Sequence, residues 1–288
     1  MTTGSTGTTG TTGADRLQEL VEIWHGCAAD VIVLLRELPD DAWQQPTDLP
    51  GWDVRAVGAH LAHLESELAG NPQQQVEVPE ASHIHGLMGQ FTEGGTIARA
   101  GWTSDEIVDE LERSVATRYA ALTGDPPGDP DAPGPGFAGL IGWSWQTLLT
   151  NRPFDVWMHE QDIRRATDRP GNLDSRGAEH ALDVFSRSLS YVLGKLVRAP
   201  AGTSLVVEIT PPGHDVDGAA RLLAVEIGED GRGRLVEPPT APSVRLRMDV
   251  ETFVVLSGGR RSPEQVTVEA EGDEELAARV LAAMAVTP

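Results

Sequence analysis

The strongest constraint on the fold is a change of hydrophobic pattern partway along this chain of 288 residues. Before residue 172, apolar residues recur at helical intervals, and all seven tryptophans lie within the first 157 residues. After it come short β-like runs, of which SVRLRMD alternates most clearly. A chain of this length can form two hydrophobic cores of ordinary size. We therefore predict two domains with a boundary near residue 172.

A helical bundle is predicted for the first domain, residues 14–172. Asp53 is a good N-cap for its second helix, and Gly70 is a natural stop. The segment GDPPGDPDAPGPG has nine Pro or Gly in thirteen positions, so it must be a loop. Four long helices with irregular connections are typical of a bundle. These helices are predicted at 15–38, about 54–70, 103–122 and roughly 146–168.

The smaller second domain, residues 173–288, is predicted to have an α+β fold with a mainly antiparallel sheet. A helix over 173–197 comes first. Candidate strands follow, with a short helix at DVETFVVLSGG and a closing helix at DEELAARVLAAMA. This mixed order favours helices packed against an antiparallel sheet. The candidate strands are SLVVEIT, ARLLAVEIG, GRLVEP, SVRLRMD and QVTVEAEG.

Composition excludes several classes of function. The net charge of −22 disfavours nucleic acid and anionic membranes, which bind basic patches. We expect no membrane span and no signal peptide, and a disordered Thr/Gly/Ser tail at residues 1–13. The one cysteine, Cys27, excludes an internal disulfide and is expected in the core. A cytoplasmic protein is therefore predicted, in which any thiol chemistry uses a thiol from outside the chain.

Histidines and carboxylates on two predicted helices are the main candidates for chemistry. Asp155 and His159 are four residues apart, so a helix places them on one face, and His60 lies on the apolar face of another helix. A bundle core can assemble a metal site from facing helices. Two neutral imidazoles and a carboxylate suit Zn²⁺, which keeps an open position in catalytic sites. We predict His60, Asp155 and His159 as metal ligands.

An alternative without metal fits the same spacing. Asp155 and His159 would then form a surface ion pair worth a few tenths of a kcal/mol, and His60 would be a core histidine. Rival ligands also exist. Two share the helix of His60, and a His-x-His pair lies in a loop-like stretch with no carboxylate nearby. These rivals are His63, Glu67, His83 and His85.

Two strings about ninety residues apart, LPGWDVRAVGAHLAHLE and FDVWMHEQDIRRATDRPG, resemble the mycothiol-dependent maleylpyruvate isomerase family. That family belongs to the DinB-like metal-binding four-helix superfamily. The second part of the chain is similar to the family's smaller sterol-carrier-like α/β domain. The resemblance implies zinc ligands at His60, Asp155 and His159. The namesake isomerase has a glutamate where this chain has Asp155, whose side chain is one methylene shorter.

The resemblance implies a zinc-dependent enzyme that uses mycothiol on a small electrophile. In the namesake reaction the mycothiol thiolate adds to the double bond of maleylpyruvate, and rotation and elimination then give fumarylpyruvate. Permanent transfer of the sulfur would make the enzyme an S-transferase instead. Family members carry a glycine-arginine element similar to the one at Arg260, so Arg260 is a candidate catalytic residue that binds a substrate carboxylate. The neighbouring Arg261 is a rival, and a solvated loop arginine is the structural alternative.

Three further expectations concern the surroundings of the site and the class of protein. Asp162 either accepts a proton from the imidazole of His159 or is an ordinary surface carboxylate. Trp52 and Trp157 are expected in the core. The competing class is a non-catalytic metal-binding or regulatory DinB-like protein. We expect a monomer or a small homo-oligomer.

Overall fold

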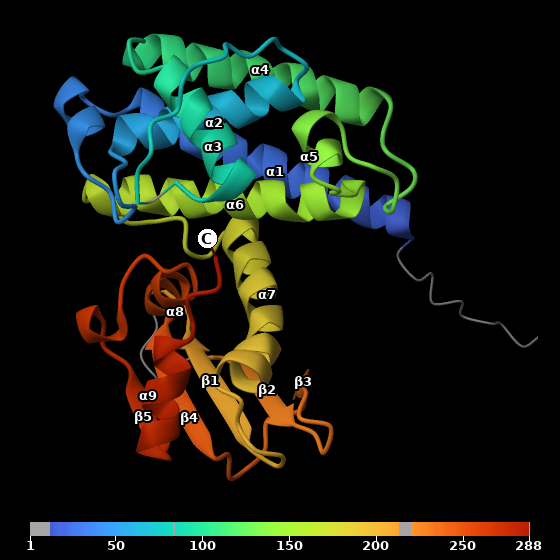
Figure 1. The fold of residues 1–288 in the computed structure, drawn as a ribbon, viewed down its shortest axis with the longest axis vertical. Helices are drawn as coiled ribbons and strands as arrows, with labels where there is room; N and C mark the ends of the chain where they lie inside the picture. The colour runs from blue at the N-terminus through green and yellow to red at the C-terminus, as the bar shows by residue number, and fades with distance from the viewer. Residues whose placement is uncertain (1–11, 83, 213–219, 288) are drawn as a thin grey trace, which may run out of the picture. The chain divides into compact units, whose positions relative to one another are not determined.

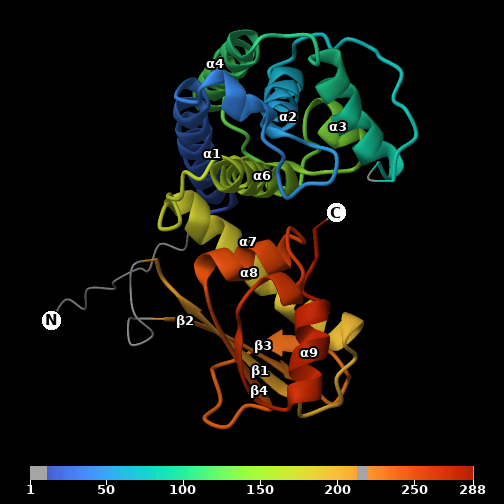
Figure 2. The ribbon, with the colours of Figure 1, turned by 90° about the vertical axis from the view of Figure 1, so that its left-hand side faces the viewer.

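The computed structural model describes residues 12–82, 84–212 and 220–287. The chain forms two compact units, Met1–Gln45 with Gly51–Ile163 and Pro46–Pro50 with Arg164–Pro288. The first is helical and the second contains a five-stranded sheet (Figures 1 and 2), which confirms the predicted α+β class. The domain boundary at residue 172 stays a prediction. Residues 1–11 of the predicted tail lie outside the described residues.

Four long helices form the first unit, as the periodicity predicts (Figure 1). Their starts follow from side-chain caps. Thr12 and Thr103 each form a capping box, and Asp53 accepts a hydrogen bond from the backbone N–H of Ala56. Helix α2 packs against α4, and α4 packs against α1. The four helices are α1 (Gly13–Arg36), α2 (Val54–Leu68), α4 (Ser104–Gly124) and α6 (Trp145–Ala166).

Helix α3 (Gly86–Ala98) was not predicted. Its sequence GLMGQFTEGGTIA contains four glycines, which are poor helix formers, so propensity argues against it. Packing on α2 explains the helix instead. A Cβ atom added at Gly95 would lie 2.0 Å from ring carbons of His63, so this glycine admits the imidazole between the two helices. The described part of the unit also contains two short helices, the 3₁₀ helix η1 (Asp40–Gln44) and α5 (Gly136–Leu140).

Gly95→Ala should therefore destabilise the first unit, by about 1–3 kcal/mol, because the new methyl group overlaps the His63 ring. Gly26→Ala in α1 is the matched control, since nothing lies within 4 Å of its added Cβ. That change should stabilise the unit by roughly 0.5–1 kcal/mol through helix propensity. Urea denaturation followed by tryptophan fluorescence measures both. If both substitutions stabilised the unit, or both destabilised it, the packing of α3 on α2 would be contradicted.

The second unit contains a sheet of order β3-β2-β1-β4-β5. Three of its neighbouring pairs are antiparallel and β1 pairs with β4 in parallel, so the predicted mainly antiparallel sheet is confirmed. All five strands fall within predicted runs, although β3 and β5 each cover only half of their runs. The strands are β1 (Ser204–Thr210), β2 (Arg221–Ile227), β3 (Gly233–Leu235), β4 (Val244–Asp249) and β5 (Glu269–Gly272).

Three helices pack on this sheet. Helix α7 contacts β2 and β3, α8 contacts β1 and β4, and α9 contacts β4 and β5. Phe185 and Phe253 meet edge to face, at 6.2 Å between ring centroids, and join α7 to α8. No helix among the described residues has the length and apolar character that a membrane span requires. The helices are α7 (Arg176–Tyr191), the π-helical turn η2 (Val192–Leu196), α8 (Val250–Ser257), the 3₁₀ turn η3 (Pro263–Gln265) and α9 (Glu274–Ala282).

Candidate metal centre

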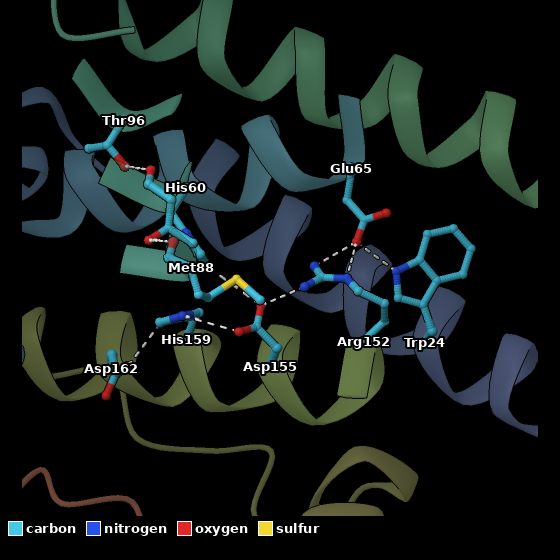
Figure 3. Close-up of polar contacts among 10 residues, drawn as sticks. Trp24, His60, Glu65, Met88, Thr96, Arg152, Asp155, His159 and Asp162 are labelled. Carbon is cyan, nitrogen blue, oxygen red and sulfur yellow. Dashed lines mark hydrogen bonds and ion pairs between the residues drawn. The ribbon is translucent and has the colours of Figure 1, made fainter. Parts of the chain in front are cut away.

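Helices α2 and α6 bring three potential metal ligands together within the first unit. His60 comes from α2, and Asp155 and His159 come from successive turns of α6. One ligand atom of each residue lies within 4.8 Å of the others, and this is the one such group among residues 12–82, 84–212 and 220–287. Figure 3 shows the three side chains converging between the two helices.

The Asp155 carboxylate faces both histidines. Its Oδ2 lies 3.6 Å from Nε2 of His60, and its Oδ1 lies 3.6 Å from Nε2 of His159. The centroids of the two imidazole rings are 4.7 Å apart, and the rings meet edge to face, with 71° between their planes. Side-chain exposure is 5% for His60, 8% for His159 and 21% for Asp155, so solvent reaches the group beside the carboxylate.

The environment of His60 favours a metal-binding imidazole. Burial lowers the pKa of His60 from 6.5 to about 4, because desolvation of the cation outweighs the attraction of Asp155. The ring is therefore neutral at physiological pH, which is the form that binds metals. Both ring nitrogens are buried and find no hydrogen-bond partner in the described part of the chain. A cation beside Nε2 would satisfy one of these nitrogens, so the residues present fit a metal ion.

Asp155 is held as an anion. Burial by itself would raise the pKa of this carboxyl, but the charge of Arg152, together with weaker interactions with His159 and His60, outweighs it and holds the pKa well below 3.8. Arg152 Nη1 donates a hydrogen bond of 2.8 Å to Oδ2 of Asp155. The carboxylate therefore keeps its negative charge at neutral pH, as a metal ligand must.

Asp162 orients one of the imidazoles. Its Oδ2 lies 3.1 Å from Nδ1 of His159, and its side chain is fully buried, so the surface-carboxylate alternative is wrong. An ionised carboxylate can only accept, so Nδ1 of His159 carries the proton. The lone pair of His159 is then on Nε2, the nitrogen that faces Asp155. A carboxylate partner on a histidine is the usual second interaction in metal sites.

Trp52 forms a wall beside both imidazoles. Its ring centroid lies 5.0 Å from that of His60 and 6.1 Å from that of His159. Its indole N–H donates to Glu93 of α3 at 2.9 Å, which fixes the ring. The expectation that Trp52 is a core residue is therefore wrong, because the side chain is half-buried and borders the site. Trp157 is fully buried, as predicted.

The rival ligands are engaged elsewhere or lie apart from the group. His63 is buried, and its Nδ1 is 2.9 Å from Oε1 of Gln73. Glu67 accepts a hydrogen bond of 2.8 Å from the backbone N–H of Phe137. His85 is the exposed N-cap residue of α3, and His83 lies outside the described residues. None of the described rivals joins the three-residue group.

Three other residues singled out in the sequence, Cys27, Arg260 and Arg261, are not part of the three-residue group. Cys27 is buried in α1, as expected for a core cysteine. Arg260 belongs to the second unit, where its Nη1 donates to the backbone oxygen of Gly258 at 2.7 Å. Nε of Arg261 lies 3.3 Å from Oδ2 of Asp48, also in that unit. The catalytic role of Arg260 stays a prediction.

A buried cluster of charges adjoins the site and was missed by the sequence reasoning. Glu65 of α2 is completely buried and accepts hydrogen bonds from Trp24, Arg118 and Arg152. These donors lie on α1, α4 and α6, so the cluster joins all four long helices (Figure 3 draws Trp24, Glu65 and Arg152). The one available signal was the position of Arg152, three residues before Asp155 on the same helix.

Comparison with known proteins agrees with this architecture. The family model of the mycothiol maleylpyruvate isomerase N-terminal domain matches residues 24–164, and that of the MDMPI C-terminal domain matches residues 179–279. Two crystal structures of the mycothiol-dependent maleylpyruvate isomerase, one a histidine-to-alanine mutant, each have 16% identity and a TM-score of 0.51. Both comparisons cover 88% of this chain and 92% of the other. No curated protein matches the chain at a significant level.

A helical bundle that gathers two histidines and an aspartate between two helices, followed by an α+β unit, defines a class of candidate metal proteins. Both domain models of one family match in the same order, and together they span most of the chain. The chain belongs to the mycothiol-dependent maleylpyruvate isomerase family. The resemblance seen in the sequence is thereby confirmed.

Proposed function

We propose that this chain is an enzyme that uses mycothiol at a divalent metal ion, with zinc the best candidate, and that it isomerises maleylpyruvate or a close analogue. His60, Asp155 and His159 would hold the metal. The observation that carries the proposal is the convergence of these three side chains within 4.8 Å in a chain of this family. Three protein ligands leave one position for an external ligand, as in catalytic zinc sites.

A divalent metal and mycothiol, when bound together, supply a thiolate nucleophile at neutral pH, because a coordinating thiol is deprotonated. The chain's own residues prepare the site for both. His60 stays neutral because it is buried, and Asp155 stays ionised because Arg152 lies beside it. Asp162 holds the proton of His159 on Nδ1. The thiol has to come from outside, since Cys27 is buried in α1.

Two further residues, Trp52 and Arg260, are proposed to orient the substrate. The indole of Trp52 gives the site an apolar wall, fixed by its hydrogen bond to Glu93. Arg260 of the second unit is the proposed partner of a substrate carboxylate, as the family resemblance suggests. Orientation of a reactant can supply several kcal/mol of a catalysed barrier. We place the reaction in the cytoplasm, where small thiols stay reduced.

The test is a reaction of the full chain, loaded with zinc, with mycothiol and maleylpyruvate. We expect fumarylpyruvate to form only when both zinc and mycothiol are present, with mycothiol recovered unchanged. Product analysis by chromatography and mass spectrometry decides the reaction class. Accumulation of a stable mycothiol thioether would make the chain an S-transferase. A chain that binds zinc and mycothiol but turns over neither maleylpyruvate nor other small electrophiles would be the non-catalytic alternative.

A further inference from the structure

Arg152 links the buried charge cluster to the candidate metal site. We propose that Arg152 is a positioning residue that fixes the carboxylate of Asp155 for metal binding, and that Glu65 in turn fixes Arg152. This inference rests on the metal site proposed above. Arg152 contacts the candidate metal ligand Asp155 and acts through it.

Glu65 anchors Arg152 from the core of the bundle. Its Oε1 accepts hydrogen bonds from Nε and Nη2 of Arg152, at 3.1 and 2.7 Å, and one from the indole N–H of Trp24 at 2.9 Å. Its Oε2 accepts from Nη1 of Arg118 at 2.6 Å. The side chain of Glu65 is fully buried, and those of the two arginines are 2% and 4% exposed. Moving Arg152 away from Glu65 would break two of these buried, charge-assisted hydrogen bonds.

The rigid shape of the guanidinium group connects the position of Glu65 to that of Asp155. A guanidinium is planar and rigid, so fixing one edge fixes the direction of the other. Nε and Nη2 bind Glu65, and Nη1 then donates to Oδ2 of Asp155 at 2.8 Å. Figure 3 shows Arg152 lying between the two carboxylates. The orientation of Asp155 is therefore set by a chain of contacts that begins in the core.

This contact distinguishes the two oxygens of Asp155. Each oxygen faces the Nε2 of one histidine at 3.6 Å, Oδ2 that of His60 and Oδ1 that of His159, but the hydrogen bond from Arg152 goes to Oδ2. A carboxylate with one oxygen held by a guanidinium is biased to bind a cation through the other oxygen alone. Single-oxygen binding keeps the coordination number low and preserves the open position that an external thiol needs.

A role in the stability of the core alone does not explain the arrangement. Glu65 already has a charged partner in Arg118 and a hydrogen bond from Trp24. Arg118 is as deeply buried as Arg152 and shares the same glutamate, but the hydrogen bonds it donates do not include Asp155. The two arginines therefore form a matched pair, because one reaches the candidate ligand and the other does not.

The experiment replaces each arginine of the full chain by lysine and by methionine. Circular dichroism of the metal-free proteins checks folding. Chelator competition measures zinc affinity, and the visible d–d absorption of the cobalt(II)-substituted proteins reports the geometry around the metal. We expect Arg152→Met to weaken zinc binding by roughly 10–100-fold, the usual effect of losing a residue that orients a ligand, and to change the cobalt spectrum. Arg118→Met and Arg118→Lys should keep the parent's zinc affinity and spectrum.

Arg152→Lys keeps a positive charge but cannot donate to both carboxylates through a planar fork. We expect it to bind zinc with intermediate affinity and to show the altered cobalt spectrum. Parent-like affinity and spectrum in the Arg152→Met protein, or in Arg152→Lys if the methionine variant does not fold, would overturn the inference. Equal losses at Arg118 and Arg152 would also overturn it, because both would then act through the core alone. A parent protein that binds neither metal would overturn the proposed function itself.

Discussion

His159→Ala should abolish most metal binding by the full chain. The change removes one of three candidate ligands, and a site of two protein ligands is too few for a divalent metal such as zinc. We expect the affinity for zinc to fall by more than roughly 100-fold, beyond the range typical of losing a residue that only orients a ligand. Elemental analysis of the purified protein and chelator competition measure the loss.

Two comparison variants sharpen this result. His85→Ala removes an exposed histidine outside the group and should leave metal content unchanged. Asp155→Glu restores the residue that the family's namesake isomerase carries, as the sequence resemblance implies, and should keep metal bound. Stoichiometric zinc in the His159→Ala protein would show that the metal lies elsewhere or binds adventitiously.

Glu65→Gln should strongly destabilise the helical unit, although Glu65 is not a candidate ligand. The change removes the charge that faces Arg118 and Arg152, both buried, and keeps the shape of the side chain. Breaking a buried ion pair by neutralising one partner typically costs about 3–5 kcal/mol, because the remaining charges cannot return to water. We expect a loss of that size in the free energy of unfolding of the metal-free protein.

Tryptophan fluorescence suits this measurement, because every tryptophan lies in the first 157 residues and so reports on the helical unit. Glu112→Gln is the matched control, since its carboxylate contacts Arg36 at 2.8 Å on the surface. An exposed pair of this kind contributes about 0–1 kcal/mol. Similar losses in the two variants would show that the buried cluster is not a source of stability.

The sequence predicts those parts of the molecule that local patterns determine. Asp53 and Thr103 mark helix starts through caps that involve residues three positions away. The pair Asp155 and His159 lies on one helix, so its proximity follows from the helical repeat. Adding His60 to this pair required only the assumption that the apolar faces of two helices meet in a bundle. Such features could be read from spacing because each depends on few contacts.

Other parts depend on contacts between residues that are far apart in the sequence, and no local pattern predicts them. Glu65 and Arg152 are 87 positions apart, and each looks like an ordinary helical surface charge in the sequence. Helix α3 forms despite four glycines, because Gly95 lets it pack closely on His63. Trp52 looked like a core residue because the sequence does not reveal that its ring borders two imidazoles. Tertiary packing overrides local preference in all these cases.

The buried charges also bear on how the site is built. An apolar core of similar volume is often as stable as a buried ion cluster, so stability alone does not favour Glu65, Arg118 and Arg152. The cluster ends at Asp155, which supports a role in fixing a ligand. An accurate metal site requires rigidly held ligands, and the residues that hydrogen-bond to the ligands hold them in place.

Titration of the cobalt(II)-substituted full chain with mycothiol tests the metal–thiol site most directly. A thiolate that binds cobalt(II) gives a charge-transfer absorption in the near ultraviolet, which is absent when the thiol stays in solution. We predict a saturable absorption at one equivalent of mycothiol per bound metal, and its loss in the His159→Ala protein. No such absorption in the parent, or the same absorption with His159 replaced, would contradict a thiol-binding metal site formed by His60, Asp155 and His159.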